Sequence, residues 1–229
     1  MTTLDDLITP RSVAVVGASD DPTRIGGRPI NFFKNLGYEG SIFPVNPRRD
    51  TVQGLTAYPS LNDISDDIDF VLVAVPAAGF VDVVKDAVKK RAKTVMIFSS
   101  GFGEMNEEGQ KAQDELTRIA RESGVRIIGP NCLGVLAPRI GLNASFAHLA
   151  PKRGNLAFVA QSGAVVTSVL DWATSRNIGF SHLVSLGDMA DVDFGDMLDY
   201  LADDPDTTAI LLYIEAVTDA RKFMSAGRA

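Results

Sequence analysis

The stretch SVAVVGASD at residues 12–20 decides the fold. Four consecutive apolar residues precede Gly17, and such an unbroken run is typical of a strand that is buried on both faces of a parallel sheet. Gly17, Ala18 and Ser19 then predict a tight turn at the carboxyl end of this strand, where backbone N–H groups can meet phosphate groups. The stretch therefore predicts an α/β protein with a site for a nucleotide-like ligand.

Similar apolar runs recur along the first 130 residues, separated by stretches with helical periodicity and charged faces. This alternation is typical of repeated βαβ units. The expected strands are 12–16, 40–45, 69–75, 94–98 and 125–128, and the expected helices are 28–36, 78–91 and 107–123.

The regular pattern lapses after residue 128, where prolines and glycines interrupt it. We therefore expect a first domain at 1–138, a linker at 139–154 and a second domain at 155–229. The second domain has expected strands at 155–160, 182–186 and 209–214, with helices at 164–175, 195–202 and from 219 onward. Three strands are fewer than the roughly five or six of a typical sheet, so we expect this domain to be incomplete.

The composition excludes several classes of protein. Apolar residues make up 45% and charged residues 22% of the 229 residues, which is ordinary for a globular chain. With 22 Lys and Arg against 29 Asp and Glu, the net charge of −7 has the wrong sign for binding nucleic acid. No apolar run approaches the roughly 20 residues that cross a bilayer. A single cysteine, Cys132, cannot form an internal disulfide, which favours a cytoplasmic location.

The residues after the first two strands narrow the choice of ligand. The dinucleotide fingerprint G-x-G-x-x-G requires a second glycine where this chain has Ser19. After the second strand, an NAD site would place an acidic residue on the ribose hydroxyls, but the next charged side chains are Arg48 and Arg49. Two arginines suit an additional phosphate on the ribose, which leaves NADP or coenzyme A (CoA) as ligands. The alternative is that both arginines are solvated turn residues.

Two further strand ends lie at the same edge of the predicted sheet. Val75 and Pro76 end the third strand, and Phe98, Ser99 and Ser100 end the fourth. Ligands of open α/β sheets lie outside the carboxyl ends of the strands, and small hydroxyl residues there leave room and offer hydrogen bonds. Either end alone is consistent with ordinary turn chemistry. Together they predict a continuous crevice.

A strand also runs directly into a helix in the second domain, at Ser162 and Gly163. A helix N-terminus attracts anions through its unpaired N–H groups and its dipole, although a plain N-cap is the commoner role of such a serine. A hydrolase nucleophile is disfavoured, because the G-x-S-x-G motif is absent and the only histidines are His148 and His182.

A metal site is a further hypothesis for the second domain. Asp188, Asp191 and Asp193 could supply hard oxygen ligands. Helix caps and turns explain such residues more often, so we predict no metal ion here.

Five short motifs occur in the order and at the spacing of a known family. They are VGAS at 16–19, VNP at 45–47, VP at 75–76, SSGF at 99–102 and GPNCLGV at 129–135. On these motifs the chain resembles the succinyl-CoA synthetase α subunit and the NDP-forming acyl-CoA synthetases. The resemblance implies a Rossmann-like, parallel-sheet CoA-binding domain followed by an incomplete flavodoxin-like α/β domain.

The resemblance also implies which residues bind CoA or acyl-CoA. In that family the first turn and the loop after the second strand hold the nucleotide end of CoA, and the GPNC loop lies near its thiol end. Cys132 is not expected to be a nucleophile, because a lone cysteine is usually an inert buried residue. The implied CoA contacts are Gly17, Ser19, Asp20, Pro47, Arg49, Val75, Pro76, Phe98, Ser99, Ser100, Asn131 and Cys132.

The second domain resembles the same family. There the strand-Ser-Gly-helix turn faces a phosphorylated histidine that a glutamate orients, which implies this place for Ser162 and Gly163 and a catalytic role for Glu215. The phosphohistidine itself would lie beyond this sequence. ATP, ADP and Mg²⁺ would be handled by an ATP-grasp β-like domain or subunit, and a homo-oligomer is left open.

A second resemblance competes with the first. The stretches GLNASF at 141–146, LDWA at 170–173, LDYLA at 198–202 and DARKF at 219–223 are similar to the synthetase-like region of bacterial protein lysine acetyltransferases. That region is fused to an acetyltransferase domain and senses acyl-CoA without catalysis. We prefer the CoA-binding, α-like portion of an NDP-forming acyl-CoA synthetase, with the acetyltransferase sensor as the alternative and an NADP-dependent oxidoreductase as a more distant one.

Overall fold

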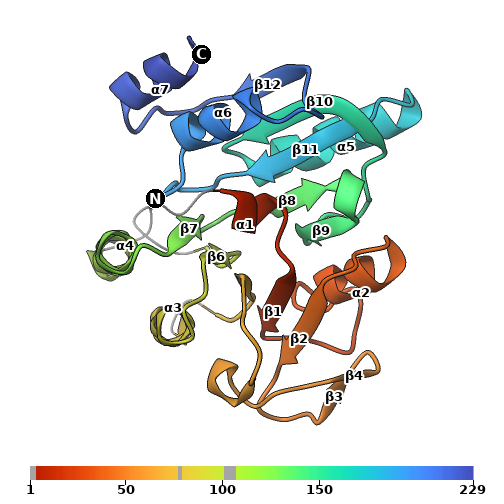
Figure 1. Ribbon diagram of the computed structural model, residues 1–229, viewed down its shortest axis with the longest axis vertical. Coiled ribbons are helices and arrows are strands. Elements are labelled where there is room, and N and C mark those ends of the chain that lie inside the picture. The colour runs from red at the N-terminus through yellow and green to blue at the C-terminus, as the bar shows by residue number, and fades with distance from the viewer. Residues whose placement is uncertain (1–3, 77–78, 101–106, 229) are drawn as a thin grey trace.

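The apolar run before Gly17 forms β1 (Ser12–Val16), which pairs with two of the other apolar runs. The computed structural model describes residues 4–76, 79–100 and 107–228. The first sheet contains, in this order, β2 (Ser41–Val45), β1, β5 (Phe70–Val73), β6 (Thr94–Ile97) and β7 (Arg126–Ile128) (Figure 1). All neighbouring strands in this sheet are parallel, which confirms the predicted α/β architecture.

Burial on both faces explains why these strands are continuously apolar. Val13 and Val15 enter one core, together with α1 (Asp5–Ile8) and α2 (Arg28–Asn35). Ala14 and Val16 enter the opposite core, which α3 (Phe80–Lys89) and α4 (Glu107–Ser123) cover. Because successive side chains of a strand point to opposite faces, a sheet between two helical layers needs apolar residues at every position.

The second sheet follows the first along the chain and has the order β12-β10-β11-β8-β9. Strands β12 (Ala209–Tyr213), β10 (Arg153–Ala160) and β11 (Phe180–Ser185) are parallel. Strands β8 (Gly134–Ala137) and β9 (Leu142–Ser145) are antiparallel to their neighbours. The helices of this part of the chain are α5 (Gly163–Ser175), α6 (Phe194–Ala202) and α7 (Ala220–Ala226).

The hairpin of β8 and β9 was not predicted. The stretch 139–154, expected to be a linker, contains most of the 3₁₀ turn η3 (Pro138–Ile140), the whole of β9 and the start of β10. Strand β9 is four residues long and contains no continuous apolar run, because Asn143 and Ser145 are polar although both are buried. A 2.5 Å hydrogen bond from Ser145 Oγ to Asn143 Oδ1 joins these two side chains. Leu142 and Ala144 join the same core as α2 of the first domain.

Several short elements were also missed, because two to four residues carry no periodic signal. They are α1, β3 (Thr51–Val52), β4 (Leu55–Thr56) and η1 (Leu61–Asp63). The helix expected at 78–91 is described from Phe80 to Lys89. Residues 77, 78 and the expected motif residues 101 and 102 lie outside the described part of the chain.

A loop of the second domain fixes the two sheets against each other. The N–H groups of Ala190 and Val192 donate to the carbonyl groups of Gly129 and Ile127, each at 3.0 Å. The Arg126 guanidinium, only 20% exposed, pairs with Asp191 at 2.9 Å and with Asp196 at 3.2 Å. The loop after β11 therefore runs beside the end of β7.

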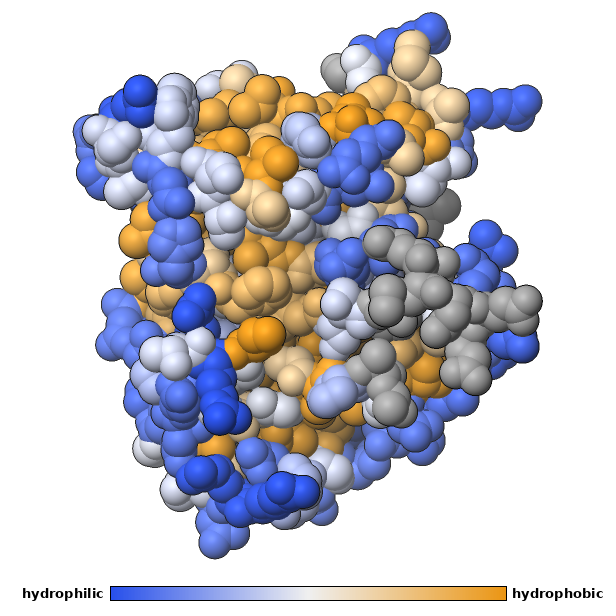
Figure 2. Space-filling view, turned by 180° about the vertical axis from the view of Figure 1, so that it is seen from behind, coloured by the Kyte–Doolittle hydropathy of each residue, from blue (hydrophilic) through white to orange (hydrophobic). Residues whose placement is uncertain are grey.

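Strand β12 differs from the strands of the first sheet, because its side chains are only partly buried. Figure 2 shows apolar surface across the part of the molecule that contains the second sheet. Within the described residues, no helix combines the length and the apolar character that crossing a membrane requires. The large apolar side chains exposed at β12 and beyond are Leu211, Tyr213, Ile214, Val217 and Met224.

The buried carboxylate of Asp69 makes stability depend on pH. Burial alone would raise its pKa, but hydrogen bonds from Lys93 Nζ and from the Arg11 N–H outweigh burial and hold the pKa below its usual value. The folded state is therefore stabilised by the ionised form, and this contribution is lost as the pH falls below about 4.

We expect Asp69→Asn to lower the free energy of unfolding at pH 7 by about 1–2 kcal/mol. Urea unfolding at pH 7 and at lower pH measures this effect. The difference between the variant and the unaltered protein should shrink on acidification, whereas an unchanged difference would contradict the role given to the carboxylate.

Candidate functional site

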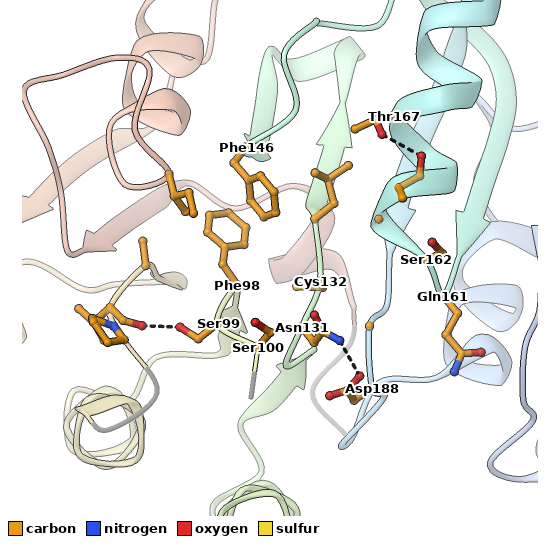
Figure 3. A pocket seen from close by; sticks show the side chains of 18 of the residues that line it. Phe98, Ser99, Ser100, Asn131, Cys132, Phe146, Gln161, Ser162, Thr167 and Asp188 are labelled. Carbon is orange, nitrogen blue, oxygen red and sulfur yellow. Dashed lines mark hydrogen bonds between the residues drawn. The ribbon is translucent and has the colours of Figure 1, made fainter. Parts of the chain in front are cut away.

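Two adjoining cavities open at the carboxyl ends of the strands. The smaller, of about 800 Å³, lies over β1 and β2, and the larger, of about 1040 Å³, lies between the first sheet and α5 (Figure 3). Ile25 and Ala74 line both cavities, so the two form one continuous cleft. The strand ends in the sequence predicted a crevice at this edge of the sheet.

Close packing of glycines builds the loop over the smaller cavity. Gly17 has a φ of +87°, and a Cβ there would lie 2.7 Å from the Ala74 carbonyl oxygen. A Cβ on Gly26 would lie 2.0 Å from the carbonyl oxygen of Gly17. Neither position has room for a side chain, so the loop at 18–27 folds directly onto the end of β1.

The turn at the end of β1 does not itself present free donors. The N–H groups of Gly17 and Ala18 donate to the Val45 carbonyl, at 3.1 and 3.2 Å, and the Ser19 N–H donates to the Gly26 carbonyl at 3.3 Å. The expectation that these N–H groups meet a phosphate is therefore wrong. Donors that line the cavity remain further along the loop, because the N–H groups of Ile25 and Gly26 make no hydrogen bond to any residue that the structure describes.

Three guanidinium groups surround the same cavity, from Arg24, Arg48 and Arg49. The Arg49 side chain is half-exposed and forms an ion pair with Asp20. Free N–H groups and several arginines around one cavity make it suited to a ligand with more than one phosphate group.

The larger cavity begins where β5 and β6 end. Val75, Pro76, Phe98, Ser99 and Ser100 line it, as the sequence predicted for the crevice. The Ser99 hydroxyl is held by the Val75 carbonyl. Figure 3 shows the Phe98 ring against a second aromatic ring from the loop after β9.

That second ring belongs to Phe146, whose place in the site no sequence motif predicted. The two rings are 5.2 Å apart and meet edge to face at 84°. They form an apolar wall of the larger cavity.

The GPNC loop forms the floor of the larger cavity. The Asn131 N–H donates to the Ser99 carbonyl at 2.9 Å, and its side-chain amide donates to Asp188 at 3.2 Å. Cys132 is 2% exposed, and burial raises the pKa of its thiol to about 12. The thiol is therefore protonated at neutral pH and is not a nucleophile.

The N-terminus of α5 borders the opposite side of the larger cavity. Ser162 is its N-cap and accepts a hydrogen bond from the Val165 N–H at 3.4 Å, so the plain capping role is present. Gly163 lies against Leu133, and a Cβ on it would be 2.9 Å from the Leu133 Cβ. Ser162 and Gly163 both line the cavity, as does the exposed Glu215 after β12.

Gln161 joins the ends of the three parallel strands of the second sheet. Its Oε1 accepts hydrogen bonds from the N–H groups of Glu215, at 3.1 Å, and Ala216, at 3.0 Å. Its backbone carbonyl accepts from the Gly187 N–H at 3.2 Å. Gln161 thereby holds Glu215 beside the start of α5, a role that the sequence did not indicate.

Some residues named from the sequence lie away from the cavities. Pro47 and Asp20 line neither cavity. The two histidines are also elsewhere: His148 Nε2 lies 2.7 Å from Asp171 on the surface, and His182 is buried. Burial lowers the pKa of His182, although the negative charge of Asp204 acts in the opposite direction and would raise it. Neither histidine lines the cavity that contains Ser162, which removes the geometric basis of a hydrolase.

The three aspartates of the metal hypothesis have separate partners. Asp191 pairs with Arg126, and Asp193 caps α6 while it contacts Lys222 at 2.8 Å. Only Asp188 lines the cleft. In the part of the chain that the structure describes, no three His, Cys, Asp or Glu side chains are grouped to hold a metal ion.

A cleft at the carboxyl edge of a doubly covered parallel sheet, with a glycine loop and arginines, defines a nucleotide-binding α/β protein. Comparison with known protein families identifies which nucleotide-binding family this chain resembles. The profile of the CoA binding domain matches residues 11–138, and that of the succinyl-CoA ligase like flavodoxin domain matches residues 153–229. The chain belongs to the CoA-binding domain family, with a succinyl-CoA ligase-like domain following the first.

Individual relatives cover nearly the whole chain. The α subunit of acetate–CoA ligase [ADP-forming] II from Pyrococcus furiosus is 42% identical over 98% of this chain and 49% of the relative. The 4-hydroxybutyrate–CoA ligase [ADP-forming] of Nitrosopumilus maritimus is 36% identical over 95% of this chain and 31% of the relative. The chain thus spans half or less of the length of these relatives.

A solved structure agrees with the fold. The dinucleotide forming acetyl-coenzyme A synthetase 1 of Ca. Korarchaeum cryptofilum, in complex with phosphate and ADP, superposes with a TM-score of 0.94. It is 36% identical, and the match covers 99% of this chain and 49% of that one.

The burial of Cys132 predicts that its thiol is unreactive in the folded protein. At pH 8 we expect alkylation by iodoacetamide to be about a thousandfold slower than for a free thiol, because the thiolate fraction falls with the raised pKa. Mass spectrometry measures the modification over time. Unfolding in guanidinium chloride should restore ordinary reactivity, and rapid labelling of the folded chain would contradict the assignment.

Proposed function

We propose that this chain is the CoA-binding, α-like portion of an NDP-forming acyl-CoA synthetase. The observation that carries the proposal is the continuous cleft: a basic, phosphate-suited cavity under the loop at 18–27 opens into a larger cavity that reaches α5 and Glu215. CoA has two parts that match these cavities: a phosphorylated nucleotide at one end, and a long uncharged arm that ends in a thiol.

The charge distribution along the cleft supports this orientation. Three arginines surround the smaller cavity. None of the described residues that line the larger cavity is Lys, Arg or His, and the sequence places no basic residue at 77–78 or 101–106. We therefore assign the phosphates to the smaller cavity and the uncharged arm to the larger one.

The residue assignments follow from this orientation. Arg49 and the N–H groups of Ile25 and Gly26 would hold phosphate oxygens, with Gly17 and Ser19 shaping the same cavity. Asp20 and Pro47 line neither cavity, so they would act only through the residues that do. We propose that the uncharged arm passes the lining residues Val75, Pro76, Phe98, Ser99, Ser100, Asn131 and Cys132.

The far end of the cleft suits a second, anionic reactant. The start of α5 at Ser162 and Gly163 supplies a helix N-terminus, and Glu215 lines the same cavity. We propose that these residues receive a phosphohistidine from outside this sequence, with Glu215 as its orienting carboxylate. An ATP-grasp part, which would bind ATP, ADP and Mg²⁺, would be the partner, and the cytoplasm would be the compartment.

The relatives favour this proposal over the alternatives. The proteins compared above are acid–CoA ligases by name, which favours a synthetase over an acetyltransferase sensor. An NADP-dependent oxidoreductase would have to bind a nicotinamide, and the relatives named above are acid–CoA ligases by name.

Calorimetric titration of this chain with CoA, dephospho-CoA and NADP tests the proposal. We expect CoA to bind more tightly than dephospho-CoA, because the arginines favour a ribose phosphate, and NADP to bind weakly or not at all. Binding of NADP without a response to CoA would contradict the proposal.

Arg49→Glu tests the assignment of the smaller cavity. Replacing a guanidinium by a carboxylate should weaken CoA binding by about tenfold or more and reduce the preference for CoA over dephospho-CoA. Arg121→Glu on α4 is the matched control, since it makes the same charge change at a residue that lines neither cavity.

Replacing Ser19 by Trp should also weaken binding, and unchanged affinity in both site variants would contradict the assignment.

A further inference from the structure

Gln53 stands at the tip of the small hairpin formed by β3 and β4, below the loop that covers the smaller cavity. The two-residue turn consists of Gln53 and Gly54, with φ values of +48° and +79°. Two left-handed residues in succession are typical of a tight type I′ hairpin turn. Such a turn strongly favours glycine or asparagine, so a glutamine here is held by its contacts.

The side chain of Gln53 ties the two ends of the loop together. Its Nε2 donates to the carbonyl oxygen of Ser19 at 2.9 Å and to that of Gly27 at 2.8 Å. Between these two residues lie Thr23, Arg24, Ile25 and Gly26, which line the cavity. One amide group, from a segment more than 25 residues away in sequence, therefore closes the loop at its base.

The backbone of Gln53 is engaged as well. Its N–H donates to Asp20 Oδ1 at 2.7 Å, and its carbonyl accepts from Lys34. The other oxygen of Asp20 pairs with Arg49, which lines the cavity. The hairpin tip is thus joined to the loop and to the arginine at the same time.

Gln53 itself lines neither cavity, so it acts on a ligand only through the loop. We propose that Gln53 is a positioning residue that fixes the loop at 19–27, so that its free N–H groups and Arg24 face the diphosphate of CoA. This inference rests on the proposed function. It adds a determinant of affinity from a segment outside the five sequence motifs.

The chemistry of the amide explains why glutamine suits this place. Binding two carbonyl groups requires two N–H donors at the end of a side chain long enough to reach them. A glutamate would offer acceptors only and would repel both carbonyl groups and Asp20. A flexible loop would have to become ordered when the ligand binds, and that cost in entropy would weaken binding.

Gln53→Met and Gln53→Gly test the proposal. Methionine keeps the length of the side chain without donors, and glycine keeps the left-handed backbone and the N–H bond to Asp20. Gln110→Met, on the surface of α4, is the matched control. Calorimetry gives the affinities for CoA and dephospho-CoA, hydrogen exchange reports the mobility of residues 19–27, and thermal unfolding reports stability.

We expect both Gln53 variants to bind CoA and dephospho-CoA about tenfold more weakly, with the ratio of the two affinities unchanged, because the loop would contact the diphosphate that both ligands share. Exchange should increase at 19–27 and not at the second sheet, and Gln110→Met should match the unaltered protein.

The outcomes separate this proposal from the proposed function. Affinities within twofold of the unaltered protein overturn the role of Gln53 and leave the proposed function intact. A loss that affects CoA alone also overturns it, because Gln53 would then act through Arg49 and the ribose phosphate. If the unaltered protein binds no CoA, the proposed function fails, and this inference fails with it.

Discussion

The close packing of Gly17 and Gly26 is the constraint on which the cleft depends. Gly17 meets the carbonyl of Ala74, and Gly26 meets the carbonyl of Gly17, with no space for a Cβ at either point. This packing brings the loop at 18–27 onto the end of the sheet. The N–H groups of Gly17, Ala18 and Ser19 then donate to carbonyl groups of the protein itself. Among the described residues that line the smaller cavity, Ile25 and Gly26 consequently offer their N–H groups to a ligand.

The cleft is shared by two sheets, and its two ends differ in chemistry. The first domain supplies the arginines of the smaller cavity and the strand ends that line the larger one. The second domain supplies the N-terminus of α5 and Glu215, which Gln161 holds in place. Since the loop after β11 runs beside β7, the contacts of Arg126 with Asp191 and Asp196 keep these two ends together.

The sequence predicted the features that depend on short stretches of neighbouring residues. Continuous apolar runs predicted the parallel strands, and the ends of strands predicted the lining residues from Val75 to Ser100 together with Ser162 and Gly163. The places of Asn131, Cys132 and Glu215 came from the family resemblance. The hairpin of β8 and β9 was missed because both strands are only four residues long and the buried polar residues Asn143 and Ser145 interrupt any apolar run in β9. Gln53 and Gln161 were missed because each acts through hydrogen bonds to residues distant in sequence, and no local pattern records such a contact.

A crystal structure of this chain with CoA tests the central claim most directly. We expect the phosphates beside Arg49 and the N–H groups of Ile25 and Gly26, and the thiol end in the larger cavity near Asn131. CoA bound outside both cavities, or with its phosphates at α5 and its thiol end at the arginines, would contradict this account.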